Sequence, residues 1–360
     1  MSLAARSDAP PRRAIDEAIR AIPIEWFKAS PVTYWADLLS SATIGWGAFV
    51  FAARAAGGWS RALLLTVSTL ALYRAVLFIH EITHRARRDV PAFTLVWNAL
   101  VGVPLLVPSF MYEGVHTDHH RQRSYGTGAD PEYIPFGRRS PILLVTYVLG
   151  SMLAPLAFAV RFALLAPLGW AIPPLGRFIT SHGSALVINH HYVRRAPIGV
   201  AGRAQEAATF VLCWTAAALW WNGRLPVPAL LCYAVVGAAV SGVNAARTLA
   251  AHRYDNETDE LSMDEQLLDS CTISPSGLPG QIARQMATGV RALIAPVGLR
   301  YHALHHWIPS LPYHNLGRVH RLLVTALTPD APYARTIEPA FTPVVRDLLH
   351  RARSSSLRRS

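Results

Sequence analysis

The feature that most constrains the fold of this chain is a series of long apolar segments that carry almost no charge. Hydrophobic residues make up 52% of the 360 residues, and charged residues only 16%. About 20 apolar residues suffice to cross a bilayer as a helix. Inside the bilayer only helices and closed barrels satisfy their own backbone hydrogen bonds. The sequence therefore predicts an all-α integral membrane protein.

Four apolar segments are long enough to cross the membrane, and two others are interrupted. We expect the crossings, with approximate limits, at residues 35–56, 62–78, 207–221 and 227–246. Prolines break the segments 92–110 and 141–175, and Arg161 lies in the middle of the second. We expect the first to dip into the membrane and return, or to lie in the interface. The second should form a hairpin or a pair of interfacial helices, and the number of crossings in both is left open.

Both ends of the chain are polar and basic. The sequence therefore divides into a basic N-terminal segment, 1–33, a membrane domain, 34–325, and a polar basic C-terminal tail, 326–360. We expect the Arg- and Ser-rich residues 351–360 to be disordered or lipid-facing. The first residues lack the apolar core of a signal peptide, so we expect no cleaved leader.

Three short motifs place histidines on one face of a helix, because residues three and four apart lie about one turn from each other. The histidines are His80 and His84 in HEITH, His116, His119 and His120 in HTDHH, and His302, His305 and His306 in HALHH. Burying imidazoles without partners costs several kcal/mol, whereas imidazole nitrogen is a good ligand for Zn, Fe, Cu or Ni. Eight ligands exceed the capacity of one ion, so the pattern predicts a site for two metal ions. His252 follows the last apolar segment and is a ninth candidate; alternatively it is an interfacial histidine.

The ligands of one site must emerge on one side of the bilayer. Four crossings place all three motifs, His252 and both chain ends on the same side, where a helical cap would carry the motifs. Most loop arginines also fall on this side, which should therefore be cytoplasmic. The net charge of +12 suits this topology and anionic lipid headgroups, so we expect no nucleic-acid partner. Because Lys28 is the only lysine, we favour a bacterial inner membrane.

These motifs resemble those of the membrane fatty acid desaturase and hydroxylase superfamily. HEITH, HTDHH and HALHH are similar to the three histidine boxes of that family. The segment WIPSLPYHNLGRVHRL, after the third box, is similar to the segment at the same place in many bacterial and plant desaturases. NAARTLAAHRY, which ends at Tyr254, resembles the segment that carries an additional ligand. The resemblance covers about residues 34–325.

The resemblance implies a non-haem di-iron centre, with the eight box histidines and His252 as iron ligands. Such enzymes use O2 as co-substrate and two electrons to remove hydrogen from an unactivated C–H bond of a lipid acyl chain in a tunnel. The PYHNL sequence favours a fatty acid desaturase, an oxidoreductase that acts on an acyl-lipid or acyl-CoA. A lipid or carotenoid hydroxylase or ketolase of the same superfamily is the alternative. The outcome depends on the placement of the C–H bond, which the sequence does not show.

Two departures qualify the resemblance. Thr248 stands where some animal relatives have an asparagine that helps to bind one iron. The chain also contains no HPGG motif, and hence no fused cytochrome b5. Electrons should therefore come from a separate donor, ferredoxin-like or cytochrome b5-like.

Several polar residues outside the boxes are candidates for supporting roles. Carboxylates usually orient metal-bound imidazoles, and Glu113 and Asp130 are candidates for this role. We expect the seven carboxylates of residues 255–269 to form a solvated loop, or some of them to bind ligand imidazoles. His190 and His191 lack the ligand spacing and favour a surface or headgroup role. The remaining candidates for contacts with the ligand imidazoles or with the substrate are Glu81, Asp118, Asn244, His314 and Asn315.

Two other classes of membrane protein also use histidines to bind metal. HEITH matches HExxH, the signature of zinc proteases. An intramembrane zinc metalloprotease would leave the two HxxHH motifs and His252 unexplained, and is the remote alternative. A metal transporter would place its ligands within the spans, whereas 35–78 and 207–246 contain no histidine.

Overall fold

The computed structural model describes residues 17–257, 259–275 and 281–358. These residues are almost entirely helical, which confirms the predicted fold class. The only strands among them are β1 (Thr272–Ile273) and β2 (Ile337–Glu338), which pair in parallel. The longest helices are α2 (Pro31–Arg54), α3 (Gly58–Val76), α11 (Val200–Trp221) and α12 (Val227–Thr248). A separate group at the C-terminal end comprises α13 (Met263–Asp269), α14 (Gln281–Ile294), α15 (His302–Trp307), α16 (Tyr313–Ala326) and α17 (Phe341–Leu357).

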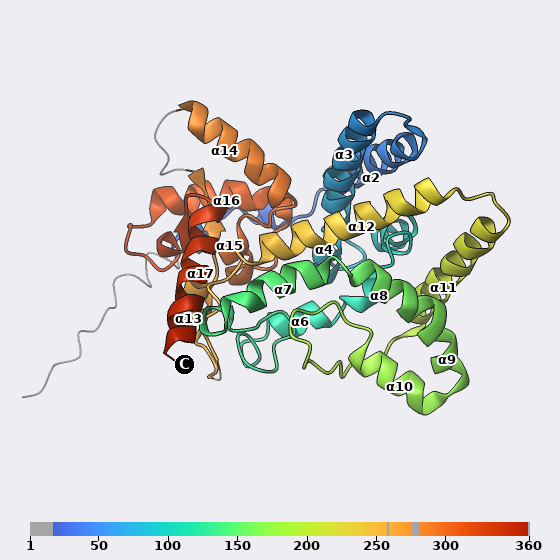
Figure 1. The fold of residues 1–360 in the computed structure, drawn as a ribbon. Helices are drawn as coiled ribbons and strands as arrows, with labels where there is room; N and C mark the ends of the chain where they lie inside the picture. Colours follow the sequence, from blue (N-terminus) through green and yellow to red (C-terminus); the bar gives the residue numbers. More distant parts are fainter. Residues whose placement is uncertain (1–16, 258, 276–280, 359–360) are drawn as a thin grey trace, which may run out of the picture.

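The molecule has a membrane part and a cap. Figure 1 shows α2, α3, α11 and α12 on one side and α13 to α17 on the other. Four helices are long and apolar enough to cross a membrane, Ile24–Arg54, Gly58–His84, Ala154–Ala171 and Val227–Thr248. Three of them match expected crossings. The remaining helix, Ala154–Ala171, was not expected to cross as a single helix. The expected crossing 207–221 is not among the four candidates.

The segment 141–175 was expected to form a hairpin or a pair of interfacial helices, and the structure gives it several helical pieces. It contains α7 (Pro141–Ser151), followed by α8 (Ala154–Val160), the π-helical turn η5 (Arg161–Leu165) and α9 (Ala166–Ala171). The last three form one apolar helix, and the chain reverses only after it, into α10 (Pro173–His182). Arg161 does not interrupt this helix, because its guanidinium pairs with Glu206 of α11 at 2.5 Å.

The same ion pair explains why α11 was predicted too short. The structure begins this helix at Val200, and its first turns carry Arg203 and Glu206. With these charged residues, α11 is not among the four candidate membrane spans, although its Val211 and Trp214 side chains are exposed and apolar. Exposed apolar side chains of this kind are what a lipid-facing helix presents.

The chain of segment 92–110 turns back on itself. It consists of α5 (Phe93–Trp97), the π-helical turn η2 (Asn98–Gly102) and, after a loop, the 3-10 turn η3 (Ser109–Met111). Ten helical residues rise only about 15 Å, half the apolar thickness of a bilayer. The Asn98 side chain accepts from the Ser109 amide at 2.8 Å and donates to the Ser109 hydroxyl at 2.9 Å. These bonds tie the returning chain to the entering helix.

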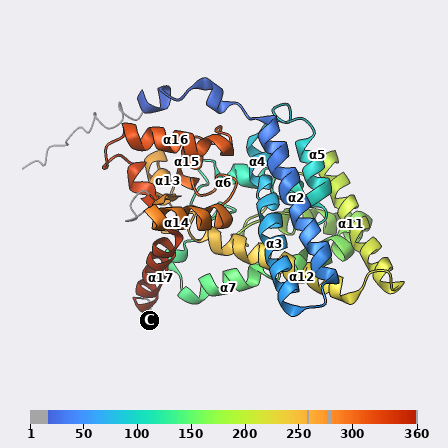
Figure 2. The ribbon, with the colours of Figure 1, turned by 90° about the horizontal axis from the view of Figure 1, so that it is seen from above.

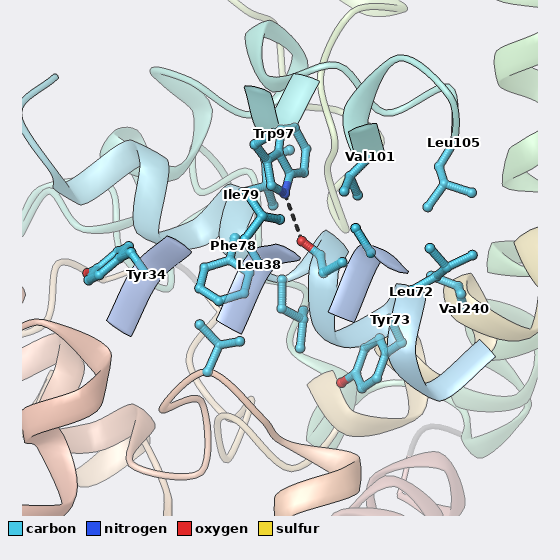
Figure 3. Packing of buried hydrophobic residues seen from close by; sticks show 14 of the residues in the cluster. Tyr34, Leu38, Leu72, Tyr73, Phe78, Ile79, Trp97, Val101, Leu105 and Val240 are labelled. Carbon is cyan, nitrogen blue, oxygen red and sulfur yellow. Dashed lines mark hydrogen bonds between the residues drawn. The ribbon is translucent and has the colours of Figure 1, made fainter. Parts of the chain in front are cut away.

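A cluster of large side chains joins α2, α3 and α5 directly below the cap. Trp97 is fully buried and donates its indole N–H to the Ala75 carbonyl at 2.7 Å. Tyr34, Leu38 and Phe78 belong to the same cluster, in which the rings of Tyr34 and Phe78 lie 6.3 Å apart between their centroids (Figure 3). Removing this much aromatic area from water stabilises the junction by several kcal/mol. The junction fixes α4 (Phe78–His84), which continues α3 and carries HEITH.

The part of the Arg- and Ser-rich segment 351–360 that the structure describes, up to residue 358, is helical through Leu357 and not disordered; residues 359 and 360 lie outside the described residues. Residues 341–357 form α17, which buries Val344, Leu348 and Ala352 along one face. The helix packs on the 3-10 turn η4 (Phe136–Arg138), and Arg351 donates to the Arg253 carbonyl at 2.8 Å. Apolar residues spaced by four explain the packing. This spacing is hard to recognise in the sequence, because many arginines and serines surround it. The other 3-10 turns are η1 (Ile24–Phe27) and η7 (Ala334–Thr336).

Candidate metal centre

Four segments from distant parts of the chain meet between the membrane part and the cap. They are α4, the helix α6 (Val115–His119), the chain just after α12, and α15. Figure 2 shows α4 and α6 between α2 and α3 on one side and α15 and α16 on the other. The chain after α12 runs beside residues 270–272, through a bridge between His252 and Ser270. Ala303 of α15 donates to the Cys271 carbonyl at 3.1 Å, which holds the third box against this segment.

All nine candidate histidines are gathered there, in two groups. Within each group one nitrogen per residue can be chosen so that all lie within 4.8 Å of one another. Each group contains residues from different boxes. The Nε2 atoms of His252 and His302, for example, lie 2.9 Å apart. The first group is His80, His84, His116, His120 and His305, and the second is His119, His252, His302 and His306. Five and four ligands suit two metal ions.

Most of these imidazoles are held in the neutral form that a metal requires. Burial lowers the pKa far below the usual value, and the neighbouring histidines lower it further. This holds for His116, His120, His302, His305 and His306. His119 differs: burial opposes its charge, but the adjacent Asp130 carboxylate leaves its pKa raised overall.

The buried nitrogens test whether a metal fits. Both ring nitrogens of His80 and the Nε2 atom of His84 are buried and have no hydrogen-bond partner among the described residues. A buried imidazole nitrogen without a partner costs free energy, and a metal ion at this position would supply the partner. The all-nitrogen donor set suits Fe, Zn, Cu or Ni. The residues therefore fit two such ions.

Carboxylates and a tyrosine hold the outer nitrogens of three imidazoles. Asp130 lies 2.8 Å from His119 Nδ1, and Glu132 lies 2.6 Å from His116 Nδ1. Tyr125 contacts His252 Nδ1 through its hydroxyl at 2.7 Å and donates to Asp269 at 2.9 Å. Such partners fix the tautomer and the ring orientation of metal-bound histidine. Burial raises the pKa of Glu132 to about 7 and that of Asp269 to about 6.

Of these outer partners, the sequence indicated only some. Asp130 was expected, and Asp269 belongs to the acidic run of which some members were expected to bind imidazoles. Glu132 was missed, although it follows Asp130 by two residues. Tyr125 was also missed, because its partner His252 lies 127 positions away and no local pattern connects them.

The other candidate residues have different roles. Asp118 bonds Arg121 at 2.5 Å and Tyr192 at 2.6 Å instead of an imidazole. Glu113 accepts from the Ser109 hydroxyl at 2.6 Å. His190 and His191 are exposed and belong to neither histidine group.

Glu81 and the PYHNL residues tie the cap to the membrane part. Glu81 is buried, accepts a hydrogen bond from the Tyr34 hydroxyl, and lies 3.9 Å from His80 Nδ1. His314 accepts from the Ser30 amide at 3.1 Å, and Asn315 donates to the Trp26 carbonyl at 2.8 Å. With Glu81 bonded in this way and seven further histidines beside HEITH, the arrangement does not favour a zinc protease.

A cavity of about 500 Å³ lies beside the first histidine group. His80, Tyr112 and Glu132 contribute to its wall. The helices α7, α8 and α12 contribute apolar side chains such as Phe158 and Val240, and Asn244 also lines it. An acyl chain in this cavity would lie next to the candidate metal centre.

Comparisons with known proteins identify the family of this chain. The family model described as fatty acid desaturase matches residues 56–337. A ceramide hydroxylase of Caulobacter vibrioides (strain NA1000 / CB15N) is 42% identical over 329 residues, which is 90% of each chain. The chain therefore belongs to the fatty acid desaturase family, a superfamily of oxygen-dependent, lipid-modifying membrane oxidoreductases.

Proposed function

We propose that this protein is a di-iron lipid hydroxylase whose substrate is a ceramide-type lipid. The observation that carries the proposal is the identity of 42% over 90% of both chains with a ceramide hydroxylase. This supports the alternative of the sequence analysis over its first choice, the fatty acid desaturase.

The contacts of the PYHNL residues also support this choice. The preference for desaturation came from PYHNL, but its residues hold the cap in place. Tyr313 donates to Asp37 at 2.7 Å, while His314 and Asn315 bond the chain around Trp26 and Ser30. None of the three lines the cavity beside the centre. The tail of the third box therefore contacts no substrate in that cavity.

In this proposal the nine histidines are the iron ligands. Iron bound there would supply the activation of O2 needed to oxidise an unactivated C–H bond. In the net reaction, one C–H bond becomes C–O–H, one oxygen atom of O2 enters the lipid, and the other leaves as water. The two electrons come from a separate donor, ferredoxin-like or cytochrome b5-like, and two protons come from water.

The protein's own residues orient the ligand imidazoles and keep water away from the centre. Asp130, Glu132 and the Tyr125–Asp269 pair orient three imidazoles, so that their other nitrogens face the metal sites. The buried surroundings exclude water, which protects a reactive centre from side reactions. The cavity aligns the substrate chain beside His80. We place the protein in a bacterial inner membrane with the centre on the cytoplasmic side.

Expression in a host that contains ceramide but lacks this activity tests the proposal. Mass spectrometry should find ceramide that has gained one oxygen atom, and the oxygen should carry label when the cells grow under labelled O2. The variant His305→Ala, which removes one proposed ligand, should give no product. Ceramide that has instead lost two hydrogen atoms would identify a desaturase, and unchanged ceramide would contradict the proposed substrate.

A further inference from the structure

The cavity beside the metal centre has one strongly polar side, at the last turns of α12. Asn244, Arg247 and Thr248 line it there, together with Ser241 one turn earlier. The Arg247 guanidinium donates from Nη2 to the Asn244 Oδ1 atom at 2.9 Å. Its Nε atom is buried and has no hydrogen-bond partner among the described residues. The cavity therefore contains a cation with donor capacity to spare.

Among the described residues, no carboxylate forms an ion pair with Arg247. Its charge reaches Glu132, which lines the same cavity, but Glu132 makes its own ion pair with His116. The C-terminal end of α12 is a favourable place for a cation, but it supplies no hydrogen-bond acceptor for the Nε atom. Arg247 is half-buried and its Nε atom is shielded from water, so an acceptor is expected from a bound molecule.

A role in holding the metal centre is a poor explanation for Arg247. Among the described residues, its guanidinium bonds the Asn244 side chain and none of the nine histidines. A guanidinium beside the centre repels metal cations instead of stabilising them. Its position is explained if it faces the substrate.

We propose that Arg247, positioned by Asn244, donates a hydrogen bond to the carbonyl oxygen of the substrate's amide or ester linkage. The hydroxyl group is then introduced on a carbon next to that linkage and not in the middle of the acyl chain. This inference rests on the proposed function, because it names the group that the hydroxylase recognises.

The composition of the cavity wall supports this position of attack. Arg247 and His80 line the same cavity, so a carbonyl bound to Arg247 brings the neighbouring carbons to the metal centre. Attack in the middle of the chain would place only methylene groups against the guanidinium, which would lose its hydration without gaining an acceptor. The apolar remainder of the cavity, around Phe158 and Val240, is left for the hydrocarbon chain.

Binding without turnover tests recognition directly. The probes are an N-methyl fatty amide and the n-alkane of equal length, bound to the purified full-length protein. A hydrogen bond to a charged donor should make the amide bind about tenfold more tightly than the alkane. Arg247→Met, which keeps the length but removes the donors, should abolish this preference, and Arg247→Lys should restore part of it. Arg203→Met, at an exposed position of α11 outside the cavity, should keep it.

The position of the hydroxyl group is the second readout. Tandem mass spectrometry of the wild-type product should place it beside the amide, and hydroxylation in the middle of the chain would overturn the inference while leaving the proposed hydroxylase intact. Equal amide preference in wild type and Arg247→Met would also overturn it. If the wild type oxygenates no ceramide, the proposed function fails, and the binding experiment still decides the role of Arg247. If Arg247→Met does not fold, absence of an amide preference in the wild type remains a contradicting result.

Discussion

In the proposed centre, the two ring nitrogens of a ligand histidine have separate tasks. One nitrogen faces a metal site, while the other, where a partner exists, donates to an oxygen. Asp130 is an example. Its carboxylate contacts His119 Nδ1 and also accepts hydrogen bonds from the Gly126 and Glu132 amides, each at 2.8 Å. A carboxylate fixed by backbone donors holds the imidazole ring in one orientation.

Replacing Asp130 should therefore weaken metal binding. Asp130→Asn keeps the size of the side chain but removes its charge and half of its acceptors, so we expect iron affinity to fall by about 10–100-fold. Competition with a chelator, followed by iron analysis, measures this. Asp118→Asn is the matched control, because Asp118 bonds Arg121 and Tyr192 and should leave the affinity unchanged. Equal iron retention in the two variants would contradict the role of Asp130.

Local spacing explains which site residues the sequence could predict. His116, His119 and His120 are separated by three and four positions, a signal that lies within one motif. The bond from Tyr125 to His252 has no such signal, because it forms only when the chain after α12 reaches the second box. The proposed contact of Arg247 with the substrate also has no signal in the sequence, since arginines are common at the ends of membrane helices for reasons of topology.

Among the elements, the helices of the membrane part show where hydropathy patterns fail. Arg161 lies in the middle of the apolar segment 141–175, and Glu206 lies directly before the expected crossing 207–221. In the structure both are buried and form one ion pair between η5 and α11. Trp170 of α9 also donates to Glu206 at 3.0 Å. The hydropathy pattern of one segment does not show that a charged residue in it is neutralised by a residue of another segment.

This ion pair gives a prediction at the level of the element. Arg161→Met alone leaves the Glu206 carboxylate buried without its cation, which should destabilise the protein by about 3–5 kcal/mol. The double variant with Glu206→Met removes both charges and should recover most of the loss. Thermal unfolding in detergent measures the three variants and the wild type. If the double variant is as unstable as the sum of the two single variants, the two residues do not act as a pair.

The whole molecule holds one site at the junction of two parts. The membrane part contributes the first box and the segment after α12, and the cap contributes the third box and the contacts that close the centre. The sequence predicted this plan, because its apolar segments and its histidine motifs are both local signals. It did not predict the cavity wall or the packed C-terminal helix α17, because both depend on contacts between distant segments.

The division of the histidines into two groups is the central claim of this account, and metal analysis tests it most directly. The full-length protein, purified after growth with iron, should contain two iron ions per chain, one for each group. His84→Ala alters the first group and His306→Ala the second, and each variant should retain about one ion. A single ion per chain in the wild type, or tightly bound zinc in place of iron, would contradict the account.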